Sequence, residues 1–134
     1  MPKYLLDASA LYLIILEPYK YTSILEDSAI LDLTLYEIGN AALVSWRRKL
    51  LRSYTGFMKS VTKAARILEI IRLGPEDIEG IARVAEKTRL TYYDSAYVYV
   101  ARKLGLVLVT EDTEILRKAR DVAKPLKGAR RVAL

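Results

Sequence analysis

Short apolar runs alternate with longer segments of helical periodicity along the 134-residue chain. Apolar runs of about four to eight residues are typical of buried strands, whereas apolar positions that repeat about every 3.6 residues indicate helices. The runs predict strands at residues 3–6, 29–33 and 106–109, with a last short strand at 131–134. The periodic segments predict helices at residues 8–16, 19–26, 35–51, 57–68, 75–87, 92–104 and 113–123.

Glycine and proline mark several boundaries of these segments. Pro75 suits the first position of a helix, where a backbone N–H is not needed, and Gly105 is a natural C-terminal cap. The Tyr54-Thr55-Gly56 segment separates two helices, and residues 69–73 fit either a helix end or a strand. Strands that alternate with helices predict an α/β sandwich around a mainly parallel sheet, in a single domain spanning residues 1–134.

The composition describes a protein with a substantial core, because 52% of its residues are apolar. The longest nearly unbroken apolar run, residues 8–16, is too short to cross a bilayer, which takes about 20 residues. Asp7 interrupts the first apolar stretch, so the chain does not open on a secretory signal, and we expect a cytoplasmic protein. Glutamine is absent and Asn40 is the single asparagine; this depletion of thermolabile amides, beside 28% charged residues, suggests a thermophilic source.

The chain contains neither cysteine nor histidine. Their absence excludes disulfides, thiolate metal sites, cysteine nucleophiles, Ser-His-Asp triads and histidine-bound zinc. Catalysis must therefore rest on carboxylates, lysine, tyrosine or hydroxyl groups, with or without a metal ion. The net charge of +6 suits a polyanion-binding protein but is also common in ordinary domains, so it decides little.

Four acidic residues occupy equivalent places in the predicted fold: Asp7, Glu37, Asp94 and Asp112. Asp7 and Asp112 each follow a predicted strand, and Glu37 and Asp94 each lie in the first turn of a predicted helix. In open α/β sheets the functional crevice lies beyond the carboxyl ends of the strands, and helix N-termini favour negative charge. We therefore expect these four side chains to meet at one edge of the sheet.

Each acid also has a purely structural interpretation. Asp7 and Asp112 suit helix N-caps, Thr34 and Glu37 have the spacing of a capping box, and residues 91–94 resemble such a box with a shorter acid. Any one of these acids alone is most simply explained as a cap, because capping acids are common. Capping does not explain four such acids at one edge of a fold, and an acid in a first helical turn is free to face the crevice as well.

Carboxylates that gather at one place have few physical outcomes. They repel one another, so either their pKa values rise or a cation neutralises them. Oxygen ligands without nitrogen or sulfur favour Mg²⁺ or Mn²⁺. One or two such ions activate water and stabilise charge on the attacking and leaving oxygens of a phosphodiester. The sequence therefore favours metal-dependent phosphodiester hydrolysis without histidine.

Four segments around these acids resemble the motifs of PIN-domain nucleases. They are YLLDASAL (residues 4–11), LTLYEIGNA (33–41), YDSAYV with the later ARKLG (93–98 and 101–105) and LVTED (108–112). The motifs occur in the family's order over almost the whole chain, with 30, 57 and 18 residues between successive acids (37−7, 94−37, 112−94). Size and motif style are most similar to VapC-type toxins of toxin–antitoxin pairs.

The resemblance implies a PIN-like three-layer α/β/α sandwich that cleaves RNA endonucleolytically. It implies one or two Mg²⁺ or Mn²⁺ ions bound by the four acids Asp7, Glu37, Asp94 and Asp112. Ser9 and Thr110 are implied as supporting hydroxyls near the metal, and Asn40 as a further polar contact. The implied partners are the RNA substrate, a second copy of the chain in a homodimer, and a small antitoxin that blocks the site.

The fourth ligand position has competitors. Glu111 and Glu114 lie beside Asp112 and add negative charge there, so either is a candidate to assist or replace it. The first three acids have no such neighbours in their motifs.

Six basic residues are candidate RNA contacts on two predicted helices: Arg47, Arg48, Arg52, Lys59, Lys63 and Arg66. Phosphate contacts through them make RNA binding weaken steeply with salt, although a solvated face or intrahelical ion pairs explain each of them equally well. Ten tyrosines against one phenylalanine is an unusual ratio. A tyrosine at a groove can stack on a splayed base, but a core or dimer interface accounts for most of them, and none is assigned a catalytic role.

Other functions are compatible with parts of the pattern. The nearest is a housekeeping PIN nuclease in RNA maturation, which has the same acids and no antitoxin, and a non-catalytic PIN-like scaffold is a further alternative. A receiver-like signalling domain pairs two acids after its first strand, but Asp7 has no acidic neighbour. A haloacid-dehalogenase-type phosphatase needs a second Asp two residues after the first, and this chain has Ser9.

Overall fold

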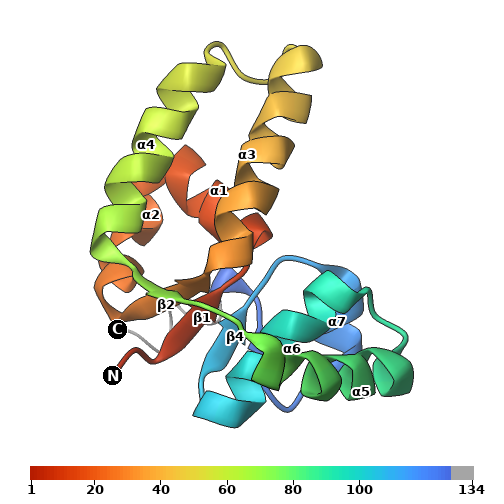
Figure 1. The fold of residues 1–134 in the computed structure, drawn as a ribbon. Coiled ribbons are helices and arrows are strands. Elements are labelled where there is room, and N and C mark those ends of the chain that lie inside the picture. Colours follow the sequence, from red (N-terminus) through yellow and green to blue (C-terminus); the bar gives the residue numbers. More distant parts are fainter. Residues whose placement is uncertain (128–134) are drawn as a thin grey trace.

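A computed structural model describes residues 1–127 of the chain. Within this range the strands form one all-parallel sheet in the order β3-β2-β1-β4-β5 (Figure 1). The strands are β1 (Tyr4–Leu6), β2 (Ser28–Leu31), β3 (Glu69–Ile71), β4 (Val107–Val109) and β5 (Ala123–Lys124). Residues 69–73, which the sequence leaves between helix and strand, therefore contribute an edge strand.

Helices cover both faces of the sheet (Figure 1). One face carries α1 (Ala8–Leu16), α2 (Pro18–Tyr21), α3 (Asp32–Arg47) and α4 (Tyr54–Ile67), with a 3-10 turn at Thr22–Asp27. The other face carries α5 (Ile78–Thr88), α6 (Tyr92–Leu104) and α7 (Thr113–Lys118), with a 3-10 turn at Pro75–Asp77. This arrangement confirms the predicted PIN-like three-layer α/β/α sandwich.

Two hydrophobic cores form because successive residues of a strand point to opposite faces. Leu6 and Ile30 pack under α1 to α4, whereas Leu5 and Leu31 pack under α5 to α7, and all four are fully buried. Burial of each such side chain stabilises the fold by about 1.5–3 kcal/mol. The strands are apolar without alternation because both faces of the sheet are covered.

The central strand pair creates a topological switch point. β1 and β4 lie side by side, but α1, which follows β1, covers one face, and α7, which follows β4, covers the other. The N–H of Asp7 donates to the carbonyl of Val109 at 3.2 Å, which ties the two strand ends together. In open parallel sheets such a point is where ligands bind, so this edge is the place to look for a site.

The boundary between the second strand and the helix that follows it differs from the predicted one. β2 ends at Leu31 and α3 begins at Asp32, so the predicted strand 29–33 is too long and the helix start at residue 35 is three residues late. The hydroxyl of Thr34 turns back and accepts the N–H of Leu31 at 3.1 Å, which closes the first helical turn early. Glu37 consequently lies in the second turn of α3, and the predicted capping box of Thr34 with Glu37 is wrong.

Other boundaries differ for local reasons. The hydroxyl of Ser53 accepts the N–H of Gly56 at 3.0 Å as an N-cap, so residues 54–56 begin α4 and α3 ends at Arg47, not near residue 51. The last predicted helix ends at Lys118, because the chain turns to form β5. The predicted helix at 19–26 is divided between α2 and a 3-10 turn, and the predicted strand at 131–134 lies outside the described residues.

Two helix ends follow the sequence closely. α6 ends at Leu104 and is capped by Gly105, whose φ of 69° is the left-handed conformation expected of a C-terminal cap. Pro75 opens the short 3-10 turn that leads into α5. Within residues 1–127, no helix combines the length and the apolar character needed to span a membrane.

Two mid-helix glycines predict stability changes of opposite sign. A Cβ at Gly80 in α5 would collide with the ring of Tyr99, whose hydroxyl donates to Asp77 at 2.9 Å. Overpacking of this kind costs about 1–3 kcal/mol, more than the roughly 1 kcal/mol that alanine gains over glycine in a helix. Gly80→Ala should therefore lower the melting temperature.

Gly39→Ala in α3, where the Cβ meets only the Met58 methyl at 3.6 Å, should raise the melting temperature. Equal effects in thermal melting would contradict this packing.

Candidate active site

Asp7 is held at the end of β1 by a set of hydrogen bonds to both carboxylate oxygens. Its Oδ1 accepts the hydroxyl of Ser9 at 2.6 Å and the N–H of Ala10 at 3.0 Å, and the latter bond makes Asp7 the N-cap of α1. Its Oδ2 accepts the hydroxyl of Thr110, which follows β4. Asp7 is therefore both a helix cap and an acid held in place at the switch point. The two predicted supporting hydroxyls, those of Ser9 and Thr110, both donate to it.

Burial raises the pKa of Asp7 above its ordinary value, because its side chain is only 5% exposed. The hydrogen bonds from Ser9, Thr110 and Ala10 act in the opposite direction, and the charge of Asp94 raises the pKa further. Hydrogen-bond donors thus stabilise the ionised form of Asp7, whereas burial and the charge of Asp94 destabilise it. A cation beside it would remove that conflict.

Glu37 lies on α3 and receives the phenolic hydroxyl of a residue on α6. The hydroxyl of Tyr97 donates to Glu37 Oε1 at 2.6 Å, and Tyr97 is almost fully buried, at 1% exposed. Burial raises the pKa of Glu37, the bond from Tyr97 lowers it, and the charges of Asp94 and Asp7 raise it. Burial also raises the pKa of Tyr97, with Glu37 adding to the rise, so the phenol remains a donor.

Asp94 connects the charges of the cluster. Burial raises its pKa, the charge of Asp112 raises it further, and the hydrogen bond of Thr91 lowers it. Asp94 in turn raises the pKa values of Asp7 and Glu37. The charge of Asp94 therefore acts on Asp7 and Glu37, and that of Asp112 acts on Asp94, although burial is the larger cause of each raised pKa.

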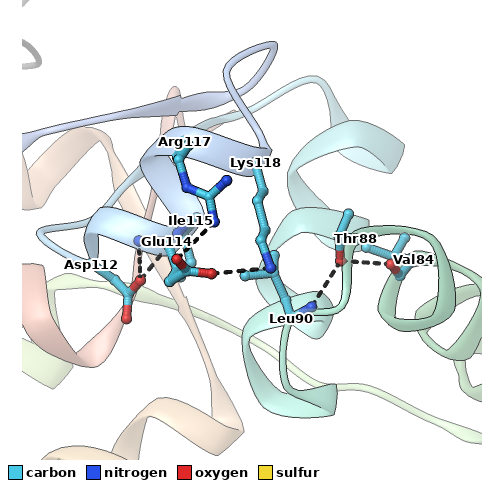
Figure 2. A network of polar contacts seen from close by, with 8 residues as sticks. All are labelled: Val84, Thr88, Leu90, Asp112, Glu114, Ile115, Arg117 and Lys118. Atoms are coloured by element: carbon cyan, nitrogen blue, oxygen red, sulfur yellow. Dashed lines mark hydrogen bonds and ion pairs between the residues drawn. The ribbon is translucent and has the colours of Figure 1, made fainter.

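Asp112 is the N-cap of α7 (Figure 2). Its Oδ1 accepts the N–H groups of Glu114 at 2.9 Å and Ile115 at 3.0 Å. The Glu114 carboxylate pairs with Arg117 at 2.8 Å and Lys118 at 3.0 Å, both on α7 (Figure 2). Asp112 thus caps its helix through one oxygen and leaves the other outside these bonds.

The competing acid Glu111 is directed to the C-terminal part of the described chain. Its Oε1 accepts the N–H of Leu126 at 3.2 Å, while its own N–H donates to the hydroxyl of Ser9 at 3.0 Å. With Glu114 held in ion pairs, both neighbours of Asp112 have other partners. The geometry therefore favours Asp112 over Glu111 and Glu114 as the fourth acid of the cluster.

The oxygen ligands available at this edge of the sheet suit a hard cation such as Mg²⁺. Within residues 1–127, no group of three or more acidic side chains stands as a ready-made metal cluster. The available groups are nevertheless carboxylates and hydroxyls, which are ligands for Mg²⁺ and Mn²⁺. Mg²⁺ commonly keeps several waters and binds through only one or two carboxylates. Burial raises the pKa values of Asp7, Glu37 and Asp94, and a neighbouring acid raises each of them further, so a positive charge at this edge would be favourable.

The remaining predicted polar and basic residues lie at different distances from this edge. Asn40 is exposed on α3, three residues after Glu37. The six basic residues are all exposed on or between α3 and α4: Arg47, Arg48, Arg52, Lys59, Lys63 and Arg66. They take part in none of the ion pairs formed within residues 1–127. Arg47 is ten residues beyond Glu37 on the same helix, which corresponds to about 15 Å. The basic residues therefore extend along the α3–α4 hairpin and do not surround the acids.

Sequence reasoning missed the polar contact between α3 and α6. The hydroxyl groups of Thr34 and Tyr97 lie 2.8 Å apart, and Tyr97 then donates to Glu37. The available signal was Tyr97 itself, three residues after Asp94 in an apolar stretch, because a buried tyrosine usually requires a hydrogen-bond partner. The sequence does not indicate which partner that is.

The raised pKa values predict how neutralising Asp94 affects the metal-free protein. A carboxyl whose pKa is raised on folding binds more protons in the folded than in the unfolded state, so stability falls as pH rises above about 4. Asp94→Asn removes that loss and relieves Asp7 and Glu37. We expect its melting temperature in chelator to exceed that of the wild type at pH 7.5, by roughly 3–5 °C for about 1 kcal/mol, and to match it near pH 4.

Glu114→Gln is the matched control, because Arg117 and Lys118 lower the pKa of Glu114. Its melting temperature should fall below that of the wild type at pH 7.5 and approach it near pH 4. If Asp94→Asn also melts below the wild type at pH 7.5, the four acids do not repel one another as described.

Comparisons with known proteins give a consistent result. No protein-family model matches the chain. Its sequence is 38% identical over 123 residues to the exonuclease VapC9 of Pyrobaculum aerophilum, covering 88% of this chain and 86% of that protein. A crystal structure of PAE2754 from the same organism superposes with a TM-score of 0.85 at 36% identity, over 98% of this chain and 97% of the other.

More distant structures share the fold. A DNA-bound VapBC from Salmonella typhimurium matches with a TM-score of 0.69 at 16% identity, over 94% of this chain and 99% of the other. A toxin–antitoxin complex from Klebsiella pneumoniae matches with a TM-score of 0.64 at 17% identity, over 92% and 97%. Together with the extended sequence identity to VapC9, these similarities show that the chain belongs to the VapC family of PIN-domain proteins.

Proposed function

We propose that this protein is an Mg²⁺- or Mn²⁺-dependent endoribonuclease and the toxin of a toxin–antitoxin pair. The observation that carries the proposal is the buried carboxylate of Asp7 at the switch point, whose two oxygens are held by Ser9 and Thr110 and whose pKa is raised by burial and, to a smaller extent, by the charge of Asp94. A cation is the simplest physical reason to maintain such an arrangement. The family relationship supports the coarser part of the proposal, a nuclease, because the relative VapC9 is named an exonuclease.

Four carboxylates would hold the ion or ions: Asp7, Glu37, Asp94 and Asp112. When bound, Mg²⁺ or Mn²⁺ supplies Lewis acidity and a water of lowered pKa. The reaction adds water across the phosphodiester: the water oxygen bonds to phosphorus, the bond from phosphorus to one ribose oxygen breaks, and that oxygen takes up a proton. The chain has no histidine to move these protons.

The side chains around the acids contribute by holding them in place. Ser9 and Thr110 donate to the two oxygens of Asp7, so its carboxylate plane is fixed before any ligand arrives. Such outer hydrogen bonds orient metal-binding carboxylates and tune their basicity. Asn40, exposed on the helix of Glu37, is proposed as a polar contact to substrate near the site.

The proposed RNA path leads from the acids along the α3–α4 hairpin. The six exposed basic residues there, Arg47, Arg48, Arg52, Lys59, Lys63 and Arg66, carry no intramolecular ion pair among residues 1–127 and are available to phosphates. Because Arg47 is about 15 Å from Glu37 along α3, these contacts involve nucleotides away from the cleaved bond. They supply affinity for the backbone and no sequence readout.

The proposal predicts cleavage of a closed circular RNA, which has no ends for an exonuclease. We expect Mg²⁺ or Mn²⁺ to support cutting of the circle and a chelator to abolish it, because the acids need a counter-ion. Asp94→Asn should reduce the rate by at least about 100-fold, the scale seen when one group that stabilises a transition state is removed. Gel analysis of circular RNA, its linear form and single-stranded DNA measures all three expectations.

Glu114→Gln, which changes an exposed acid on the adjacent helix, should cleave at the wild-type rate. Equal cleavage by the wild type and Asp94→Asn would identify a contaminating ribonuclease. Cleavage of only the linear RNA would replace the endonuclease with an exonuclease, the activity for which VapC9 is named. Cleavage of DNA alone would change the substrate class, and no cleavage with any metal would favour a binding scaffold.

The proposal includes two protein partners: a small antitoxin, and a second copy of this chain in a homodimer. An apolar groove of about 240 Å³ lies between α1 and α4 on the face away from α5 to α7, lined by Ile14, Ile15, Pro18, Leu25, Ala64 and Ile67 among others. Ile67 lines it while 53% exposed. A groove of this character suits an apolar segment of a small partner, and two of the structural relatives are toxin–antitoxin complexes.

Ile67→Asp should weaken inhibition by such a partner by a larger factor than it changes RNA cleavage, which is measured alongside because the proposed RNA contact Lys63 also lines the groove. A charge placed in the groove opposes apolar docking, and Ile67 lies away from the four acids at the end of α4. Ile78→Asp is the control, because Ile78 is 54% exposed on α5 at the opposite face. The measurement is inhibition of RNA cleavage by the antitoxin that the proposal requires. Equal inhibition of both variants would place the partner elsewhere.

A further inference from the structure

Four groups form a continuous line of hydrogen bonds from the end of β2 to Glu37. The N–H of Leu31 donates to Thr34 Oγ1 at 3.1 Å. Thr34 Oγ1 lies 2.8 Å from the hydroxyl of Tyr97, and that hydroxyl donates to Glu37 Oε1 at 2.6 Å. Thr34 is fully buried and Tyr97 is 1% exposed, so solvent does not supply alternative partners.

The number of protons fixes the direction of this line. A phenol has one O–H, and that of Tyr97 is given to Glu37. The oxygen of Tyr97 must then accept in its contact with Thr34, so the single hydroxyl proton of Thr34 points to Tyr97. Thr34 in turn accepts from the backbone of Leu31. Every member donates toward Glu37, and bonds aligned in this way polarise and strengthen one another.

We propose that Tyr97 is a positioning residue for Glu37, and that Leu31, Thr34 and Tyr97 act as a relay holding the Glu37 carboxylate in place to bind a divalent cation. The inference rests on the proposed metal-dependent function and deepens it. Tyr97 does not touch the cation; it fixes one oxygen of the carboxylate, so that the other is presented at the edge of the sheet.

The relay supplies Glu37 with a hydroxyl donor, as Ser9 and Thr110 do for Asp7. Asp7 receives hydroxyl protons from Ser9 and Thr110, which lie next to strand ends. Glu37 is on the second turn of α3, and the hydroxyl in its own motif, that of Thr34, reaches it only through Tyr97. Its donor comes from α6, the helix that also carries Asp94. One contact therefore orients Glu37 and fixes α3 against the helix of a second acid.

A purely structural role is the competing explanation, because the same bonds hold α3 and α6 together. The chain provides a matched control on α6. Tyr99 lies two residues after Tyr97, and its hydroxyl also donates to a buried carboxylate, that of Asp77 at 2.9 Å. Asp77 is bound to Gly74 and Lys103, outside the acid cluster. Loss of the Tyr99 hydroxyl removes a comparable buried bond without touching Glu37.

The experiment measures Mn²⁺ binding by electron paramagnetic resonance of the free ion, with full-length wild type, Tyr97→Phe, Tyr99→Phe and Glu37→Gln. Thermal melting in chelator reports folding of each. We expect Tyr97→Phe to bind Mn²⁺ roughly 10–100-fold more weakly than wild type, the range for loss of a hydrogen bond to a metal ligand. Tyr99→Phe should bind with wild-type affinity, even where it melts at a lower temperature.

A double variant isolates action through the glutamate. If Tyr97 acts on the metal through Glu37, then Tyr97→Phe should not weaken Mn²⁺ binding further in the Glu37→Gln background. If Tyr97→Phe does not fold, variants of Thr34 test the relay in its place. Thr34→Ala should weaken Mn²⁺ binding, whereas Thr34→Ser, which keeps the hydroxyl donor, should not.

Three outcomes overturn the inference. Wild-type affinity in Tyr97→Phe, equal losses in Tyr97→Phe and Tyr99→Phe, or an undiminished effect in the Glu37→Gln background would each reduce Tyr97 to a structural contact. In these cases wild type still binds Mn²⁺ and the proposed function stands. If the wild type itself binds no Mn²⁺, the metal-dependent function fails together with the relay.

Discussion

The candidate site depends on the cost of taking carboxylates out of water at one edge of the sheet. A buried, unpaired carboxylate is strongly unfavourable unless donors or a cation compensate it. At the switch point between β1 and β4, helix N-termini and hydroxyl groups supply the donors. Asp7 caps α1, Asp112 caps α7, and Asp94 lies in the first turn of α6. The α/β topology brings these helix starts to one edge of the sheet, so the fold creates the environment that the acids require.

Compensation by donors is incomplete, and this is the property with functional meaning. Despite three hydrogen bonds, burial still raises the pKa of Asp7, and the charge of Asp94 raises it further. By contrast Asp77, also buried, has its pKa lowered by Gly74, Tyr99 and Lys103. The same chain therefore stabilises the charged form of a structural carboxylate, whereas the surroundings of Asp7, Glu37 and Asp94 oppose the charged form. This difference is a reason to expect a cation at one place and not at the other.

The sequence predicts the parts of this arrangement that depend on local pattern. Apolar runs identify the buried strands, and the residues that follow them identify Asp7 and Asp112. Ser9 and Thr110 lie within two residues of Asp7 and Asp112 and were anticipated as supporting hydroxyls; the structure places both on Asp7. The boundary of α3 was less predictable, because the side chain of Thr34 competes for the backbone of Leu31 and starts the helix early. Strand β3 depends on pairing with β2, which residues 69–73 alone do not reveal.

The contact of Tyr97 with Glu37 lies beyond local reasoning, because it joins residues 60 positions apart. A periodic apolar pattern assigns Tyr97 to the buried face of α6 and gives no reason to distinguish its hydroxyl from its ring. The structure separates these contributions. The ring fills the core beneath α6, while the hydroxyl reaches across to Glu37 on α3. Because the core fixes the ring, the direction of the hydroxyl is fixed as well, and packing far from the edge determines how the Glu37 carboxylate is held. A substitution that shifts this helix pair would therefore act on the acids without touching any of them.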